Sequence, residues 1–126
     1  MKENKYGLKK LVSSFGYAFQ GIRHAYASEQ NIIIMTVLGF LAMALGIAFK
    51  IQLCEMLIIL VLIGIILPLE LINTAIEAIV DLHDGNNKSK YGKIAKDCAA
   101  GALTIASIIA FVIGIIIFLP RIIGLF

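Results

Sequence analysis

Acidic side chains recur in an apolar stretch of the sequence, where a membrane tolerates them only at a cost. Glu70, Glu77 and Asp81, with Asn73 among them, lie within residues 56–82, which are otherwise mostly apolar. A helix turns by about 100° per residue, so these four side chains fall on one narrow helical stripe. Because each carboxylate within a membrane costs about 2.5–3.5 kcal/mol, the aligned set indicates a polar groove. The alternative is that these groups only hydrogen-bond neighbouring helices or extend to the membrane surface.

Further charges are predicted to lie at the same membrane face. Glu29 lies at the start of the first long apolar segment, and Asp97 lies at the start of the last, directly after Lys96. Clustered carboxylates repel one another unless a cation lies among them. A set of oxygen ligands favours Mg²⁺, which keeps bound waters and binds phosphates. The residue types therefore predict Mg²⁺ together with a nucleotide polyphosphate.

Three apolar segments must position these groups. Of the 126 residues, 60% are hydrophobic and 15% are charged, whereas soluble domains average about 45–50% and about 25%. Roughly 20 apolar residues span a hydrocarbon core about 30 Å thick. The sequence predicts an all-α integral membrane domain over residues 1–126, with transmembrane helices at about 31–49, 53–82 and 97–119. A tight link joins the first two, and a polar loop over about residues 83–96 joins the last two.

The segment before the first span has the periodicity of an amphipathic helix over about residues 6–28. Its apolar residues recur every three or four positions, as expected for one helix face. They are Leu8, Leu11, Val12, Phe15, Phe19, Ile22 and Tyr26. We expect this helix to lie in the membrane surface. A helix packed on the protein bundle is the alternative.

The distribution of basic residues predicts the orientation of the chain. Five Lys or Arg residues precede the first span and four lie in the loop after the second, but only Lys50 and Arg121 lie on the opposite side. Cytoplasmic loops carry the excess of Lys and Arg, so the N-terminus is predicted to be cytoplasmic and the C-terminus outside. The net charge is only +3, and most of the eleven Lys and Arg residues are split between two short regions instead of forming one dense basic patch, so no nucleic-acid partner is expected.

Motifs of soluble kinases are missing from the sequence. There is no GxxxxGK[ST] loop, no GxGxxG motif after a strand, and no HRD or DFG set. Phosphoryl transfer requires mainly metal, positioning and charge neutralisation, so ATP remains a possible substrate.

The run ELINTAIEAIVDL at residues 70–82, followed by KIAKDCAAGA at 93–102, resembles the prokaryotic diacylglycerol kinase family. The family pattern is E-x-x-N-[ST]-A-x-E-x-x-x-D followed by A-K-D and small residues. The similarity extends to Gly21, Ala25 and Glu29 in the N-terminal helix. The two motifs look most like the Gram-positive branch, whose members phosphorylate undecaprenol.

The resemblance implies an ATP-dependent lipid kinase that forms a homotrimer, with active sites where protomers meet at the cytoplasmic face of the cell membrane. Glu70 matches the general base that acts on the lipid hydroxyl. Glu29 and Glu77 match the carboxylates that hold divalent metal ions on ATP, and Asn73 matches a residue that orients the reacting groups.

The resemblance also implies a nucleotide side of the site. Three residues match contacts to the nucleotide, namely Asp81, Lys96 and Asp97. Lys10 matches a basic position in the surface helix that contacts phosphate or substrate. Relatives often carry charged or polar residues where this sequence has Ile33 and Met35, and the His-Pro-Leu that often precedes the A-K-D motif is missing.

The sequence is thus interpreted as a membrane kinase that transfers the γ-phosphoryl of MgATP to undecaprenol. Diacylglycerol is the alternative acceptor, because no residue pattern sizes the lipid pocket. A small cation channel or transporter subunit is the alternative outside the enzyme class. A channel would place charges through the whole depth of its spans, whereas here Glu55 is the charge near the outer end of the second span.

Overall fold

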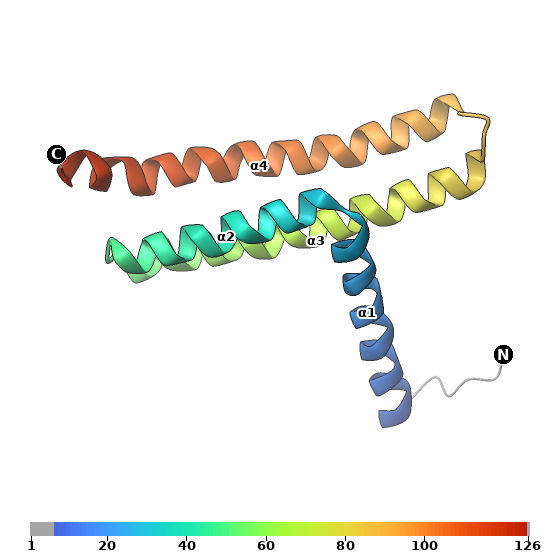
Figure 1. The fold of residues 1–126 in the computed structure, drawn as a ribbon, viewed down its shortest axis with the longest axis horizontal. Helices are drawn as coiled ribbons and strands as arrows, with labels where there is room; N and C mark the ends of the chain where they lie inside the picture. The colour runs from blue at the N-terminus through green and yellow to red at the C-terminus, as the bar shows by residue number, and fades with distance from the viewer. Residues whose placement is uncertain (1–6, 126) are drawn as a thin grey trace.

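The protein is described by a computed structural model that covers residues 7–125 and contains four α-helices (Figure 1). They are α1 (Leu8–Ser28), α2 (Gln30–Ala48), α3 (Leu53–Asp84) and α4 (Lys90–Leu125). Helices α2, α3 and α4 are long and apolar enough to cross a membrane. The prediction of three apolar helices is confirmed, and they indicate a multi-pass membrane protein.

Helix α3 lies between the other two long helices and packs against both. Figure 1 shows α2, α3 and α4 lying alongside one another, while α1 leaves them at a steep angle. Helices α3 and α4 continue past the start of α2 towards the loop that joins them. Few apolar side chains are buried, among them Ile32, Ile59 and Ile117, and most large ones are exposed. Such a surface suits hydrocarbon surroundings, because lipid tails are as apolar as these side chains.

Two ion pairs join α3 and α4 near the opposite ends of this antiparallel helix pair. Near the loop, Lys96 Nζ lies 2.6 Å from Asp81 Oδ1. At the far end, Arg121 donates through Nη2 to Glu55 Oε1 at 2.7 Å and through Nη1 to Glu55 Oε2 at 3.1 Å. Nearly equal lengths of chain separate the two pairs on each helix. One register therefore holds along the whole hairpin.

Glu29 forms the break between α1 and α2. Its backbone is extended, with φ −114° and ψ 120°, and its N–H donates to the Ala25 carbonyl at 2.8 Å as the last bond of α1. The buried side chains of Ala25 and Ile32 pack where the two helices meet. The direction of the chain therefore changes at a residue that the sequence singled out as a metal ligand.

The loop between α3 and α4 is shorter than the sequence predicted. The expected loop over residues 83–96 is wrong in extent, because α3 continues to Asp84 and α4 begins at Lys90. Gly85 ends α3 with a positive φ of 57°, a conformation that glycine adopts without strain. Ser89 then begins α4, accepting a hydrogen bond at Oγ from the Gly92 N–H at 2.9 Å. The charged residues before position 97 interrupt the apolar run of the sequence, but they do not interrupt the helix, because α4 begins at the cap formed by Ser89.

Gly92 lets α3 and α4 approach closely beside this loop. A Cβ at this position would collide with a carboxylate oxygen of Asp84 and would lie 2.7 Å from Ser89 Oγ and 2.9 Å from Val80 Cγ1. No such atoms lie within 4 Å of a Cβ at Gly101, farther along the same helix.

We expect Gly92→Ala to lower the midpoint of thermal unfolding in detergent micelles. Overpacking costs about 1–3 kcal/mol, which outweighs the roughly 1 kcal/mol by which Ala is the better helix former. Gly101→Ala is the matched control and should be neutral or slightly stabilising. A Gly92→Ala protein as stable as the Gly101→Ala protein would contradict the close approach.

Candidate active site

Glu70 is the most enclosed polar residue that the structure describes. It lies in α3 one turn beyond Ile66, and its exposed fraction is 0%. Among residues 7–125, neither carboxylate oxygen has a hydrogen-bond partner. An isolated buried carboxylate is costly, so a group without an internal partner indicates an external one.

Asn73 and Glu77 continue the same face of α3. Asn73 is 7% exposed and donates from Nδ2 to Glu77 Oε1 at 3.0 Å. Its own Oδ1 is buried without a partner. One amide thus orients a carboxylate and keeps a free oxygen acceptor beside Glu70.

Glu29 approaches Glu70 from the break between α1 and α2. The negative charges of Glu29 and Glu77 both act on the Glu70 carboxylate. Glu29 immediately precedes α2, but its side chain makes no capping hydrogen bond to that helix, so its carboxylate remains available. The structure therefore brings three predicted site residues, Glu29, Glu70 and Glu77, close enough for their charges to interact.

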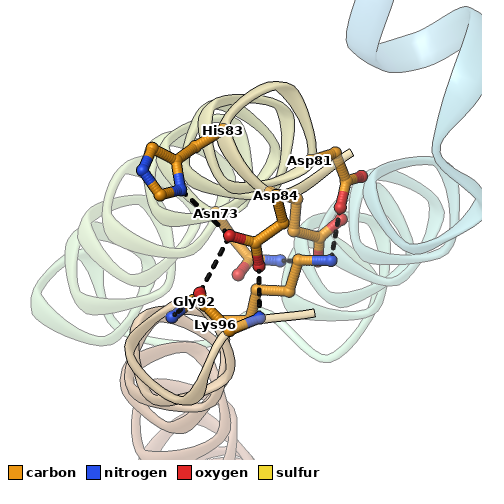
Figure 2. A network of polar contacts seen from close by, with 8 residues as sticks. Asn73, Asp81, His83, Asp84, Gly92 and Lys96 are labelled. Carbon is orange, nitrogen blue, oxygen red and sulfur yellow. Dashed lines mark hydrogen bonds and ion pairs between the residues drawn. The ribbon is translucent and has the colours of Figure 1, made fainter. Parts of the chain in front are cut away.

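Asp81 and Lys96, predicted to contact nucleotide, are paired with each other across α3 and α4 (Figure 2). Asp97 instead lies 2.6 Å from Lys93 Nζ, one turn earlier on α4. Both carboxylates are largely exposed, with exposed side-chain fractions of 69% for Asp81 and 61% for Asp97. These charges therefore lie on the accessible surface of the bundle, closer than Glu70 to the loop between α3 and α4.

Within one chain, Lys10 lies far from the other predicted site residues. It lies near the start of α1, an exposed position. At about 1.5 Å per residue, nineteen residues of chain place it roughly 28 Å along the helix from Glu29. Figure 1 shows this end of α1 far from the three long helices.

A hydrogen-bond network next to the Asp81–Lys96 pair was not anticipated from the sequence. Asp84 Oδ2 accepts from the Ser89 N–H at 3.1 Å, and Ser89 Oγ donates to Asp84 Oδ1 at 2.8 Å. The ring of His83 also bonds to Asp84 Oδ1, at 3.0 Å (Figure 2). A Ser three residues before Gly92 at a helix start is the signal that could have found it. The network holds the loop and hence the spacing of Asp81 and Lys96.

An apolar cavity of about 560 Å³ lies between α2 and α4, with α3 as its floor. Its lining includes Gly39 of α2, Ile59 and Ile66 of α3, and Phe111 of α4. Met35 of α2 lines it too. Residues four apart share a helix face, so the α3 side of this cavity runs from Ile66 towards Glu70.

The donors near Glu70 suit a hard cation that also binds phosphate. Among residues 7–125 no three His, Cys, Asp or Glu side chains gather as a complete metal site. Mg²⁺ is usually held by one or two carboxylates with waters and substrate phosphates completing its shell. The carboxylates of Glu29 and Glu77 and the unpartnered Asn73 Oδ1 fit that requirement.

Comparison with known proteins identifies the family of this chain. The model of the family described as prokaryotic diacylglycerol kinase matches residues 16–118. The chain is 35% identical over 115 residues to a diacylglycerol kinase of Synechocystis sp., covering 91% of this chain and 66% of that protein. It is 35% identical over 120 residues to an undecaprenol kinase of Bacillus subtilis, covering 95% and 97% respectively.

A diacylglycerol kinase of Escherichia coli K12 is 26% identical over 112 residues, with 89% of this chain and 91% of that protein covered. The matched region contains Glu29, Glu70, Asn73 and Glu77, and the family and the named relatives are lipid kinases. With most of its length matched, this chain belongs to the prokaryotic diacylglycerol kinase family.

Proposed function

We propose that this protein is a lipid kinase that transfers the γ-phosphoryl of MgATP to the hydroxyl of undecaprenol at the cytoplasmic face of the cell membrane. The observation that carries the proposal is Glu70, a buried carboxylate without an internal partner beside two further carboxylates. Membership of a lipid kinase family supports the reaction class. Similarity to an undecaprenol kinase over 97% of its length supports the acceptor.

Glu70 is the proposed general base. One of its oxygens accepts the proton of the lipid hydroxyl while the hydroxyl oxygen forms a bond to the γ-phosphorus and the bond from that phosphorus to the ADP oxygen breaks. The cavity between α2 and α4 offers a place for the hydrocarbon chain of the lipid, because its α3 lining runs towards Glu70. The apolar chain and the reactive hydroxyl would then meet the protein on one face of α3.

The nucleotide is proposed to lie on the exposed side of Glu70. Glu29 and Glu77 would hold Mg²⁺, and Asn73 would orient the reacting groups through its free Oδ1. When bound, Mg²⁺ neutralises phosphate charge and orients the γ-phosphoryl group. Asp81, Lys96 and Asp97 lie farther towards the loop, where a water-soluble nucleotide has access.

A homotrimer would complete this site. Within one chain, roughly 28 Å of helix separates Lys10 from Glu29, so we propose that Lys10 reaches phosphate or substrate in the site of a neighbouring protomer. The excess of basic residues before the first span and in the loop after the second supports an orientation with the N-terminus in the cytoplasm. The apolar face of α1 would then lie in the membrane surface.

We expect undecaprenol to be phosphorylated faster than diacylglycerol by the purified protein with MgATP. Each lipid is presented at the same mole fraction in mixed micelles, and incorporation of phosphate into lipid is measured. A preference for diacylglycerol would assign the protein to that acceptor, in line with its 35% identity to the Synechocystis sp. diacylglycerol kinase. No phosphorylation of either lipid by folded protein would overturn the kinase and favour a channel or transporter subunit.

A further inference from the structure

Among the residues that the structure describes, one side-chain hydrogen bond crosses the break between α1 and α2. Tyr26 Oη, on the last turn of α1, lies 2.6 Å from Thr36 Oγ1 on the second turn of α2. Glu29 lies between the two residues in the sequence, at the break itself. The bond therefore joins the two helices across the candidate metal ligand.

The direction of this bond is fixed by its neighbour. Thr36 Oγ1 donates its hydrogen to the Ile32 carbonyl at 2.7 Å. A threonine hydroxyl has one hydrogen, so Tyr26 must be the donor and Thr36 the acceptor. The result is a directed chain from Tyr26 through Thr36 to the backbone of α2.

Between residues 7 and 125, no second side-chain hydrogen bond joins α1 to α2 near Glu29. The Glu29 side chain makes no capping hydrogen bond to α2, and its extended backbone interrupts the helix between α1 and α2. Helix α1 packs against α2 and α3 only near the break and otherwise leaves the bundle (Figure 1). A small rotation about Glu29 would move its carboxylate relative to Glu70 and Glu77, and errors of about 1 Å in a positioned group can be costly.

We infer that Tyr26 and Thr36 are positioning residues, which set the angle between α1 and α2 and thereby hold the Glu29 carboxylate where it can serve bound MgATP. This inference rests on the proposed function. It assigns no direct contact between Tyr26 and substrate. Removing the bond should therefore affect the nucleotide side of the reaction and spare the lipid side.

Tyr26→Phe removes the donor and keeps the ring. We expect the KM for MgATP to rise about two- to tenfold, the range that corresponds to one net hydrogen bond, while kcat and the KM for lipid stay near wild-type values. Tyr17→Phe, the same change at a position of α1 that is 70% exposed, is the matched control and should leave all three constants unchanged.

Thr36→Val should have the same effect as Tyr26→Phe, and the double variant should be no worse than either, because both lose one bond. Thr36→Ser keeps the hydroxyl that accepts the hydrogen bond from Tyr26, so its KM for MgATP should stay near the wild-type value. Thr104→Val controls for loss of a threonine hydroxyl that bonds only to its own helix, at the Ala100 carbonyl. Equal losses on the lipid and nucleotide sides, or additive effects of the two substitutions, would overturn the inference.

The angle itself can be measured without activity. Spin labels at Gln20 of α1 and Asn87 of the loop, with Cys54 and Cys98 replaced by Ser and labelled chain diluted with unlabelled chain, report one distance within a protomer. Tyr26→Phe should broaden or shift this distance, and Tyr17→Phe should not. An unchanged distance in Tyr26→Phe would overturn the inference, whereas a wild-type protein that binds no MgATP would overturn the proposed function.

Discussion

Replacing Glu70 by Gln is expected to lower turnover by about 10²–10⁴-fold while MgATP binding stays near the wild-type value. Gln keeps the shape of the side chain but cannot accept the proton of the lipid hydroxyl. The carboxylate has no hydrogen-bond partner among the described residues, so its loss leaves no partner group unpaired. Removing an isolated buried charge should leave thermal stability unchanged or higher.

The combination of lower turnover with retained stability separates catalysis from structure. If Glu70 only supported the fold, Glu70→Gln would lower stability and activity together. Glu70→Asp should recover little turnover, because the shorter side chain withdraws the base from the hydroxyl. Glu55→Gln makes the same chemical change at the far end of α3, where it weakens the pair with Arg121 and should lower stability but not turnover. Near wild-type turnover of Glu70→Gln with saturating lipid would show that another group takes the proton.

Glu29→Gln and Glu77→Gln should each weaken binding of MgATP by about 10–100-fold. Interactions with a charged group contribute about 1.5–3 kcal/mol, which corresponds to that range. Each substitution removes negative charge and little volume, so the fold should persist. In Glu77→Gln the amide oxygen can still accept the hydrogen bond that Asn73 donates to Glu77 Oε1.

The measurement is nucleotide affinity as a function of Mg²⁺ concentration, with Glu55→Gln again as the matched control. Raising the Mg²⁺ concentration should recover part of the affinity of the two variants and should not change the control. Affinity with wild-type Mg²⁺ dependence in both variants would reject the ligand assignment. Loss of the folded state in both would favour the alternative that these carboxylates only bond neighbouring helices.

The sequence alone was sufficient for the apolar helices and for the relation among residues of α3. Hydrophobic run length depends only on the order of residues, and three such runs form the three long helices. Helical periodicity is equally local, so Glu70 and Asn73 could be placed on one face before any contact was known, and both are buried polar residues in the structure. The family resemblance, carried by these motifs, is confirmed by the match over residues 16–118.

The extent of the helices could not be taken from composition. Residues 90–96 are rich in lysine, so the third span was predicted to begin only after them. In the structure they form the first turns of α4. Ser89 caps this helix start, and Asp84, on the other side of the loop, bonds to Ser89. Hydropathy reports where hydrocarbon contact ends, whereas hydrogen bonds decide where a helix ends.

Only the tertiary structure decided which charges meet. Glu29 and Glu70 are far apart in sequence, and their approach depends on the antiparallel packing of α2 and α3 and on the break at residue 29. The pairing of Lys96 with Asp81 and of Asp97 with Lys93 depends on the register of α3 and α4. Periodicity gives each helix its faces, but the angle and register between helices come from side-chain packing and hydrogen bonds between distant segments, and these set the geometry of the site.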